Sequence, residues 1–356
     1  MNKLFRILLI ILLFSACKND DTIDIEMGTP SETFISAVDI SRFPEISSAG
    51  TKFYNTNGEL NSFLNILKNS NINTIRLRLW VNPNTEHSGF NEVKEFSKRL
   101  KELGFNIWLT LHYSDTWADP GQQKIPSEWM GLSFSGLNEK IYSYTKNVME
   151  QINPEFVQIG NEINNGILHP EGHITNNYIQ FSELIQSGIK AVREHSQTSK
   201  IILHFAGIDG ADWFFNQVKT FDYDIIGLSY YPIWHGKSIA ELETKMNSLA
   251  TTHNKQILIA ETAYPFTLDW NDWTNNIVGL QEHLILPEYP ASKEGQRLFV
   301  KKMKTICNKV QNGIGFCYWG GELVAWKGTE GIDASPWENQ ALFDFNNKTL
   351  PVLNEF

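Results

Sequence analysis

Residues 154–166 read PEFVQIGNEINNG, an apolar, strand-like run that ends in Asn161 and Glu162. The pattern returns in NKQILIAETAYP at residues 254–265, where the apolar run ends at Glu261. A folded chain seldom buries a carboxylate unless the acid is paired or has a chemical task. These two runs therefore indicate strands that deliver acidic side chains to a site.

Strand-like and helix-like segments alternate on both sides of these runs. The strand-like segments are 33–40, 73–81, 105–113, 155–162, 200–207, 223–232, 256–261 and 313–321. Apolar residues at helical spacing predict helices over 91–104, 138–152, 178–192, 238–252 and 299–310. This alternation predicts an α/β fold, a single (β/α)8 TIM barrel with enlarged βα loops that spans residues 32–356. The alternative is an open doubly wound sheet, but no GxGxxG follows the first strand and no P-loop occurs.

The composition argues against several classes of function. The formal net charge is −10, and a chain this acidic is a poor nucleic-acid binder because phosphate contacts supply most of that affinity. Three cysteines are too few for a disulfide scaffold, and no Cys/His cluster has zinc-like spacing. We expect Cys307 and Cys317 to be packed thiols, with a bridge between them as the alternative.

Every predicted strand carries polar or aromatic side chains at its C-terminal end, where a barrel of this type has its active site. In chain order these are Asp39; Arg76, Arg78 and Trp80; His112, Tyr113, Asp115, Trp117 and Asp119; Asn161 and Glu162; His204; Tyr230 and Tyr231; Glu261; Tyr318 and Trp319. Two long predicted loops, 113–137 and 262–292, also start at this end, and long ordered loops are usually functional.

Two glutamates at the ends of the fourth and seventh strands suit retaining glycoside hydrolysis, in which one carboxyl is the nucleophile and the other the acid and then the base. The acid needs a raised pKa, which the neighbouring carboxylate would provide. We expect Asn161 to bond the 2-hydroxyl of the sugar and Arg78 to hold the nucleophile ionised.

The same residues also have structural interpretations. A lone strand-end glutamate is more often a salt-bridge partner or helix cap, and His112 or His204 alone is more often a satisfied interior histidine. The matched pair of glutamates nevertheless favours catalysis. The tryptophans of LDWNDW, residues 268–273, are expected either to bind ligand or to pack the loop.

Several stretches resemble glycoside hydrolase family 53, the arabinogalactan endo-β-1,4-galactanases of clan A. They are AVDIS, RLRLWVNP, LHYSDTWADPGQQ, IGNEINNG, IGLSYYPIWHG, ETAYP and SPWENQALFDF, which together span residues 37–345. The resemblance implies a retaining mechanism with Glu162 as acid/base and Glu261 as nucleophile. It also implies cleavage of the β-1,4-galactan side chains of pectin. We expect substrate contacts from Asp39, Arg78, Trp80, His112, Asp115, Trp117, Asn161, His204, Tyr231, Trp234 and Trp319.

Two alternatives stay open beside this reading. One is another clan A endo-glycanase, a mannanase or a glucanase, against which the family-specific stretches argue. The other is a non-catalytic glycan-binding lipoprotein, which predicts the loss of a carboxylate, although both are present. After the eighth strand YWGGELVAW replaces the Trp-Glu-Pro pattern of many relatives. This departure leaves product length and endo or exo action open.

Catalysis of this kind requires no cofactor. Bacterial family members often hold calcium between the loops that follow the seventh and eighth strands. Here Asp269 and Asp272, with Ser335 and Glu338, keep part of such a site, but the usual histidine is missing. A structural calcium ion is therefore an alternative to our expectation of none.

The N-terminus has the order of a bacterial lipoprotein signal. Lys3 and Arg6 precede an apolar run, and Ser15 and Ala16 precede Cys17. This order predicts a signal peptide over residues 1–16, acylation of Cys17 and a flexible tether over 17–31. An ordinary secretory signal is the alternative. We accordingly expect a monomeric outer-membrane lipoprotein, at the cell surface or on the periplasmic face.

Overall fold

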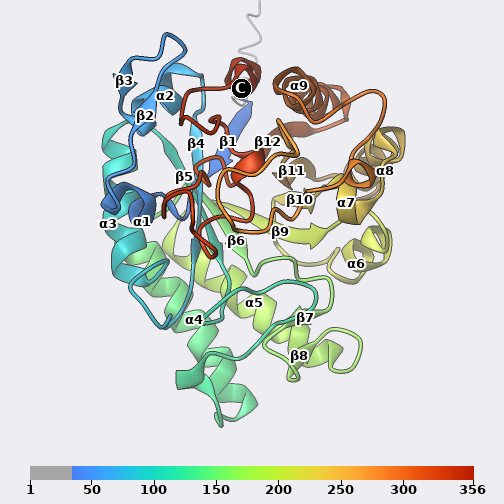
Figure 1. Cartoon of the computed structure of the whole chain (residues 1–356). Coiled ribbons are helices and arrows are strands. Elements are labelled where there is room, and N and C mark those ends of the chain that lie inside the picture. The colour runs from blue at the N-terminus through green and yellow to red at the C-terminus, as the bar shows by residue number, and fades with distance from the viewer. Residues whose placement is uncertain (1–33) are drawn as a thin grey trace, which may run out of the picture. The chain divides into compact units, whose positions relative to one another are not determined.

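The computed structural model describes residues 34–356, whose centre is a closed barrel of eight parallel strands (Figure 1). The strands are β1 (Ile35–Asp39), β4 (Thr74–Leu79), β5 (Asn106–Leu111), β6 (Phe156–Ile159), β9 (Lys200–Ala206), β10 (Ile225–Ser229), β11 (Gln256–Thr262) and β12 (Gly313–Trp319). Around the ring they follow the order β1-β12-β11-β10-β9-β6-β5-β4, in which β1 pairs with β4 and closes the barrel. The predicted TIM barrel is confirmed.

Helices follow the strands and surround the barrel (Figure 1). The α-helices are α1 (Phe43–Ser48), α2 (Phe63–Asn69), α3 (Phe90–Glu102), α4 (Phe134–Gln151), α5 (Tyr178–His195), α6 (Ala211–Gln217), α7 (Pro232–His235), α8 (Ile239–His253) and α9 (Lys293–Lys309). Short 3-10 helices span Ser127–Trp129, Gln281–His283, Glu338–Gln340 and Pro351–Glu355. Two small hairpins, β2 (Phe53–Tyr54) with β3 (Leu60–Asn61) and β7 (Gly166–Ile167) with β8 (Gly172–His173), lie outside the barrel sheet.

Alternation along the strands creates two apolar layers. On β4, Ile75, Leu77 and Leu79 join the large core that includes the helix faces. The opposite faces of the strands supply a smaller cluster made of Ile35, Ala37, Trp108, Ile202, Ile225, Leu258, Ala260 and Cys317. This second cluster fills part of the barrel interior, so the interior is packed with side chains. Arg76, by the same alternation, also lies inside the barrel and is 1% exposed.

The structure differs from the sequence-based expectation mainly in short elements. Helices α2 and α6 each have seven residues, too few to show a clear helical period, and both were missed. Cys307 and Cys317 are buried free thiols, as expected. No helix among residues 34–356 is long and apolar enough to cross a bilayer. The predicted signal peptide, Cys17 and the tether lie outside the described residues.

Candidate active site

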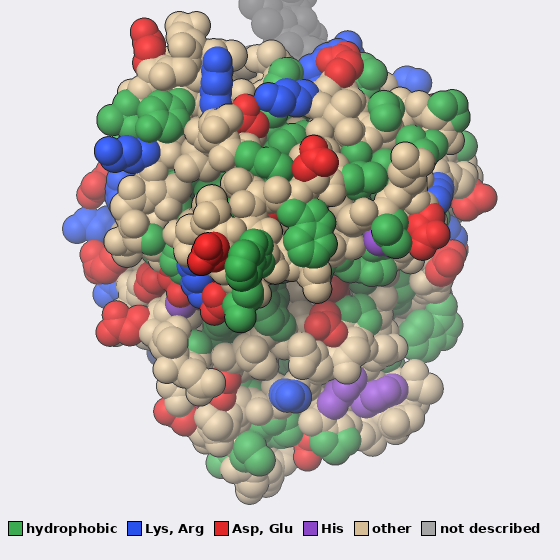
Figure 2. Space-filling model, in the orientation of Figure 1, with side chains coloured by type: hydrophobic (Ala, Val, Ile, Leu, Met, Phe, Trp, Pro, Cys, Tyr) green, Lys and Arg blue, Asp and Glu red, His purple; other side chains and the backbone are tan. Residues whose placement is uncertain are grey.

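A cavity of about 590 Å³ opens beside the C-terminal ends of the barrel strands. Its lining includes Asp39, Arg42, Arg76, Arg78, His112, Trp117, Asp119, Asn161, Glu162, Tyr231, Trp234, His235, Glu261, Trp319 and Trp337. In the space-filling view, hydrophobic, acidic and basic side chains lie next to one another around a hollow near the middle of the face shown (Figure 2). Aromatic faces beside charged groups suit a sugar, whose rings have apolar faces and hydroxyl edges.

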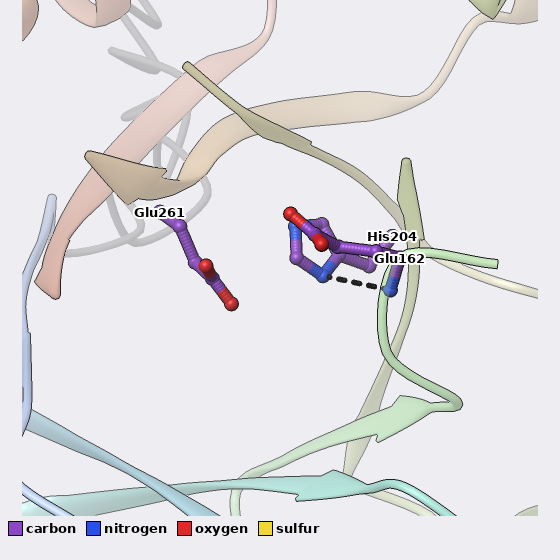
Figure 3. A group of neighbouring side chains, drawn as sticks. All are labelled: Glu162, His204 and Glu261. Carbon is purple, nitrogen blue, oxygen red and sulfur yellow. Dashed lines mark hydrogen bonds between the residues drawn. The ribbon is translucent and has the colours of Figure 1, made fainter. Parts of the chain in front are cut away.

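The two predicted carboxylates meet in this cavity. Glu261 extends from β11, and Glu162 extends from the segment after β6 toward the same space (Figure 3). An oxygen of Glu162, an oxygen of Glu261 and a nitrogen of His204 all lie within 4.8 Å of one another. Retaining glycosidases place their carboxyl groups about 5–5.5 Å apart, whereas inverting enzymes need about 6.5–9.5 Å. The spacing therefore fits retention.

A β-bulge turns Glu261 into the cavity. On β11, Ile257 and Ile259 face the outer core and Leu258 and Ala260 face the interior, so strict alternation would send Glu261 outward. The pairing register shifts between Ile259 and Thr262 against β12, and just before Glu261 against β10. A bulge inserts one extra residue and re-aims the next side chain. Glu261 thereby reaches the interior.

Arg76, and not Arg78, holds Glu261. An Nη atom of Arg76 lies 2.7 Å from Oε1 of Glu261, and its other Nη lies 2.8 Å from Oδ2 of Asp39. Tyr231 donates its hydroxyl hydrogen to Oε2 of Glu261 at 3.0 Å. Burial keeps the pKa of Glu261 above its usual value, and the charge of Arg76 and the hydrogen bond from Tyr231 limit that rise. The assignment of the nucleophile's cation to Arg78 is thus wrong.

Arg78 instead builds the aromatic wall of the cavity. Its guanidinium carbon lies 4.2 Å from the ring centre of Trp117 and 4.7 Å from that of Trp80. It donates to Ser88 at 2.9 Å and contacts His87 at 2.5 Å. Arg78 is two residues beyond Arg76 on the same strand face, so its side chain starts about 6.6 Å further along the strand.

Glu162 lies in a strained and half-buried position. Its φ of 45° is in the left-handed region that non-glycine residues rarely adopt, and such strain is concentrated at functional sites. The chain approaches it through Gly160, where a Cβ would meet Ile163 at 2.4 Å. Burial, followed by repulsion from Glu261, raises the pKa of Glu162 to about 8. The repulsion expected from the neighbouring carboxylate is therefore present, but burial raises the pKa of Glu162 more.

Eight of the eleven predicted substrate contacts line the cavity: Asp39, Arg78, His112, Trp117, Asn161, Tyr231, Trp234 and Trp319. Three do not. Asp115 accepts the backbone N–H groups of Asn82 and Ser127, so it fastens two loops. Trp80 makes a T-shaped contact with Trp117, and His204 is fully buried beside Ser229. These three side chains are not part of the cavity lining.

Sequence reasoning did not assign several side chains to the site. Trp337 lines the cavity and packs 4.8 Å from Trp319, centroid to centroid; the stretch SPWENQ that carries it was noticed only as a family resemblance. Ser229 donates to Glu162 from β10 at 2.5 Å, and no local signal distinguishes it from other strand serines. Trp270 and Trp273 are 51% and 63% exposed, so they do not simply pack the loop.

No group among the described residues besides Glu162, His204 and Glu261 brings together three His, Cys or acidic metal ligands. Both nitrogens of His204 are already used, since Nδ1 contacts Gln158 at 2.9 Å and Nε2 contacts Ser229 at 2.9 Å. A metal ion would lack its nitrogen ligand there. The group therefore fits a carboxylate pair with a supporting histidine better than a metal centre.

Comparisons with known proteins agree with this geometry. Residues 35–356 match the family model described as glycosyl hydrolase family 53. An arabinogalactan endo-β-1,4-galactanase from Cellvibrio japonicus is 33% identical over 96% of this chain and 94% of its own length. An endo-β-1,4-galactanase from Bacillus subtilis is 31% identical over 92% and 86%. The solved GH53 catalytic domain from Ignisphaera aggregans is 35% identical, with a TM-score of 0.85 over 92% of this chain and 96% of that one.

Proposed function

The chain belongs to glycosyl hydrolase family 53, and we propose that it is a retaining endo-β-1,4-galactanase that cleaves the galactan side chains of pectin, including arabinogalactan. The carboxylate pair carries this proposal, since two acids within 4.8 Å have different partners. Glu261 has an arginine and a tyrosine hydroxyl, whereas Glu162 has one serine hydroxyl. This difference favours an ionised Glu261 beside a protonated Glu162.

The proposed first step uses both acids at once. A carboxylate oxygen of Glu261 attacks the anomeric carbon as the bond from that carbon to the leaving oxygen breaks. Glu162 gives its proton to the leaving oxygen, so a neutral sugar hydroxyl departs. Arg76 stays paired with Asp39 while Glu261 loses its negative charge, so the cation is not left alone.

The second step reverses the proton transfer. Glu162, now a carboxylate, takes a proton from water, and the water oxygen attacks the anomeric carbon as the ester bond to Glu261 breaks. Two displacements retain the β-configuration. Activity should fall at low pH when Glu261 is protonated, and at high pH when Glu162, with its pKa of about 8, has lost its proton.

The substrate class can be tested with a panel of polysaccharides. The purified chain should release oligosaccharides from β-1,4-galactan and little from β-mannan or cellulose. Chromatography of early products distinguishes internal cleavage, which gives a range of lengths, from release of a single short product. Preferred hydrolysis of mannan or cellulose would favour the other clan A endo-glycanases, and binding of galactan without products would favour the glycan-binding protein.

In place of the expectation of no metal ion, we propose a structural calcium ion between the loops that follow β11 and β12, separate from catalysis. Asp272, Asn276 and Glu338 each have a buried side-chain oxygen without a hydrogen-bond partner. The other Glu338 oxygen accepts the N–H groups of Asn271 and Asp272 at 2.6 and 3.3 Å, which brings the segment together. Oxygen-only ligand sets suit Ca²⁺. This region therefore has candidate calcium ligands even though the usual histidine is missing.

Calcium should raise the unfolding temperature of the EDTA-treated protein, because an ion that binds only the folded state at 100 times its Kd stabilises by about 2.7 kcal/mol. Differential scanning calorimetry with and without CaCl2 measures this shift. Asp272→Asn should reduce it, while Asp333→Asn, an exposed acid on the neighbouring loop, should leave it intact. An unfolding temperature indifferent to calcium would remove the ion from the proposal.

We also propose that the chain is a monomeric bacterial outer-membrane lipoprotein acylated at Cys17, on the cell surface or the periplasmic face. The support is the stretch LLFSAC, residues 12–17, after the basic Lys3 and Arg6. Cys17→Ala should move the protein from the membrane fraction to the soluble fraction, as followed by immunoblot. A Ser15→Ala variant should stay anchored. Full retention of the Cys17 variant in membranes would contradict a lipid anchor at this residue.

A further inference from the structure

Ser229 and His204 lie on the inner face of the barrel, directly behind Glu162. Both are 0% exposed, and neither is part of the cavity lining. Ser229 ends β10, and His204 lies on β9, beside it. Neither side chain can touch a substrate, yet the Ser229 hydroxyl reaches Oε1 of Glu162 at 2.5 Å. Any effect on catalysis must therefore pass through Glu162.

The hydrogen bonds of Gln158 determine which groups donate and which accept in the contacts behind Glu162. Trp108 Nε1–H can only donate, and it reaches Oε1 of Gln158 at 3.2 Å. The amide nitrogen of Gln158 therefore faces Nδ1 of His204, 2.9 Å away. The backbone N–H of Glu162 points to the same Nδ1 at 3.4 Å (Figure 3). Asn161 Oδ1 also lies 3.3 Å from Nδ1, but this oxygen already accepts from Arg76 at 3.0 Å and from Gln158 at 3.1 Å. The N–H of Glu162 donates to Nδ1, so we assign Nδ1 as the acceptor.

It follows that His204 is neutral and carries its hydrogen on Nε2. Burial and the nearby Arg76 charge hold the pKa of His204 well below its usual value, in agreement with a neutral ring. Nε2–H donates to the Ser229 oxygen at 2.9 Å. The Ser229 oxygen already accepts from His204, and its own hydrogen points to Glu162 Oε1.

We infer that Gln158, His204 and Ser229 form a one-way chain of hydrogen bonds that keeps the transferable proton of Glu162 on Oε2. Because Oε1 is occupied by a donated hydrogen, the acid proton has only the other oxygen to occupy. Oε2 then gives its proton to the leaving oxygen and later accepts one from water. Ser229 is a positioning residue in this scheme, which rests on the proposed glycosidase function.

Ser229→Ala tests the chain, because it removes the hydroxyl without touching the cavity. Turnover of galactan should fall about 10-fold or more, which is part of the 10²–10⁴-fold that a general acid typically contributes. KM should change little. The alkaline limb of kcat/KM should move to higher pH, because the Ser229 hydrogen bond lowers the pKa of Glu162. An activated nitrophenyl galactoside, whose leaving group hardly needs a proton, should lose less in the first step.

Ser36→Ala is a matched control. Ser36 is 4% exposed on β1 of the same barrel, and its hydroxyl has no hydrogen-bond partner, so its removal should leave both limbs of the pH profile in place. If Ser229→Ala fails to fold, Ser229→Cys, a weaker donor of similar shape, should show the same shift in smaller degree.

An unmoved alkaline limb would overturn the inference, as would an equal loss with both leaving groups, since a purely structural defect produces that result. A wild-type protein without activity on galactan or the galactoside would instead contradict the proposed function. The two failures are therefore distinguishable in one set of measurements.

Discussion

Replacement of Glu261 with alanine should reduce turnover of galactan by roughly 10⁴–10⁶-fold, as the loss of nucleophiles does in other hydrolases. The variant has no group to form the covalent intermediate. The fold should survive, because Arg76 keeps its ion pair with Asp39 at 2.8 Å after the second carboxylate is gone. Steady-state rates and thermal unfolding, measured on the same preparation, check both parts.

Azide provides a stereochemical test of the same variant. The vacated space beside Arg76 can accept a small anion, which would attack the anomeric carbon from the side of the missing carboxylate. With an activated β-galactoside, Glu261→Ala plus azide should therefore produce an α-galactosyl azide, identified by NMR. Glu150→Ala, which changes a half-exposed acid on α4, should behave like the wild type. Rates near the wild-type value in Glu261→Ala would remove the assignment.

The barrel could be predicted from the sequence because the strand period and the helix period of apolar residues are both visible within short segments. Apolar runs marked all eight strands, and β4 showed its inner and outer faces through the alternation of Arg76 and Arg78 with Ile75, Leu77 and Leu79. The hairpins and short helices in the loops have too few residues to show a period. Their positions depend on contacts with the barrel, which no local pattern contains.

The two acids of the site were predicted from the sequence, but the side chains that pair with them were not. Glu162 and Glu261 were found because each ends an apolar run, where a buried carboxylate needs a reason. The choice between Arg76 and Arg78 depends on how far up the strand each guanidinium lies, and both are on the same face. The inward direction of Glu261 depends on the bulge in β11. That bulge arises from the pairing of β11 with β10 and β12, so the sequence of β11 alone does not reveal it.

Glu162→Gln should distinguish the roles of the two carboxylates, because the rate lost on removing a general acid depends on the leaving group. A galactan linkage leaves as a basic sugar alkoxide and needs a proton, so the variant should lose about 10²–10⁴-fold on galactan. A nitrophenolate leaves without help, so the glycosyl-enzyme should still form from the activated galactoside. Its hydrolysis should be slow, because Glu162 must also activate water. Stopped-flow measurements should therefore show a burst of nitrophenol followed by a slow steady state.

The burst also distinguishes Glu162 from Glu261. Glu261→Gln has no nucleophile and should show no burst with either leaving group. Azide added to Glu162→Ala should intercept the intermediate and produce a β-galactosyl azide, opposite in configuration to the product of Glu261→Ala. A first step equally impaired with both leaving groups would contradict the proton-donor role of Glu162. An α-azide from the Glu162 variant would require the two assignments to be exchanged, since the anion must then enter from the side of the nucleophile.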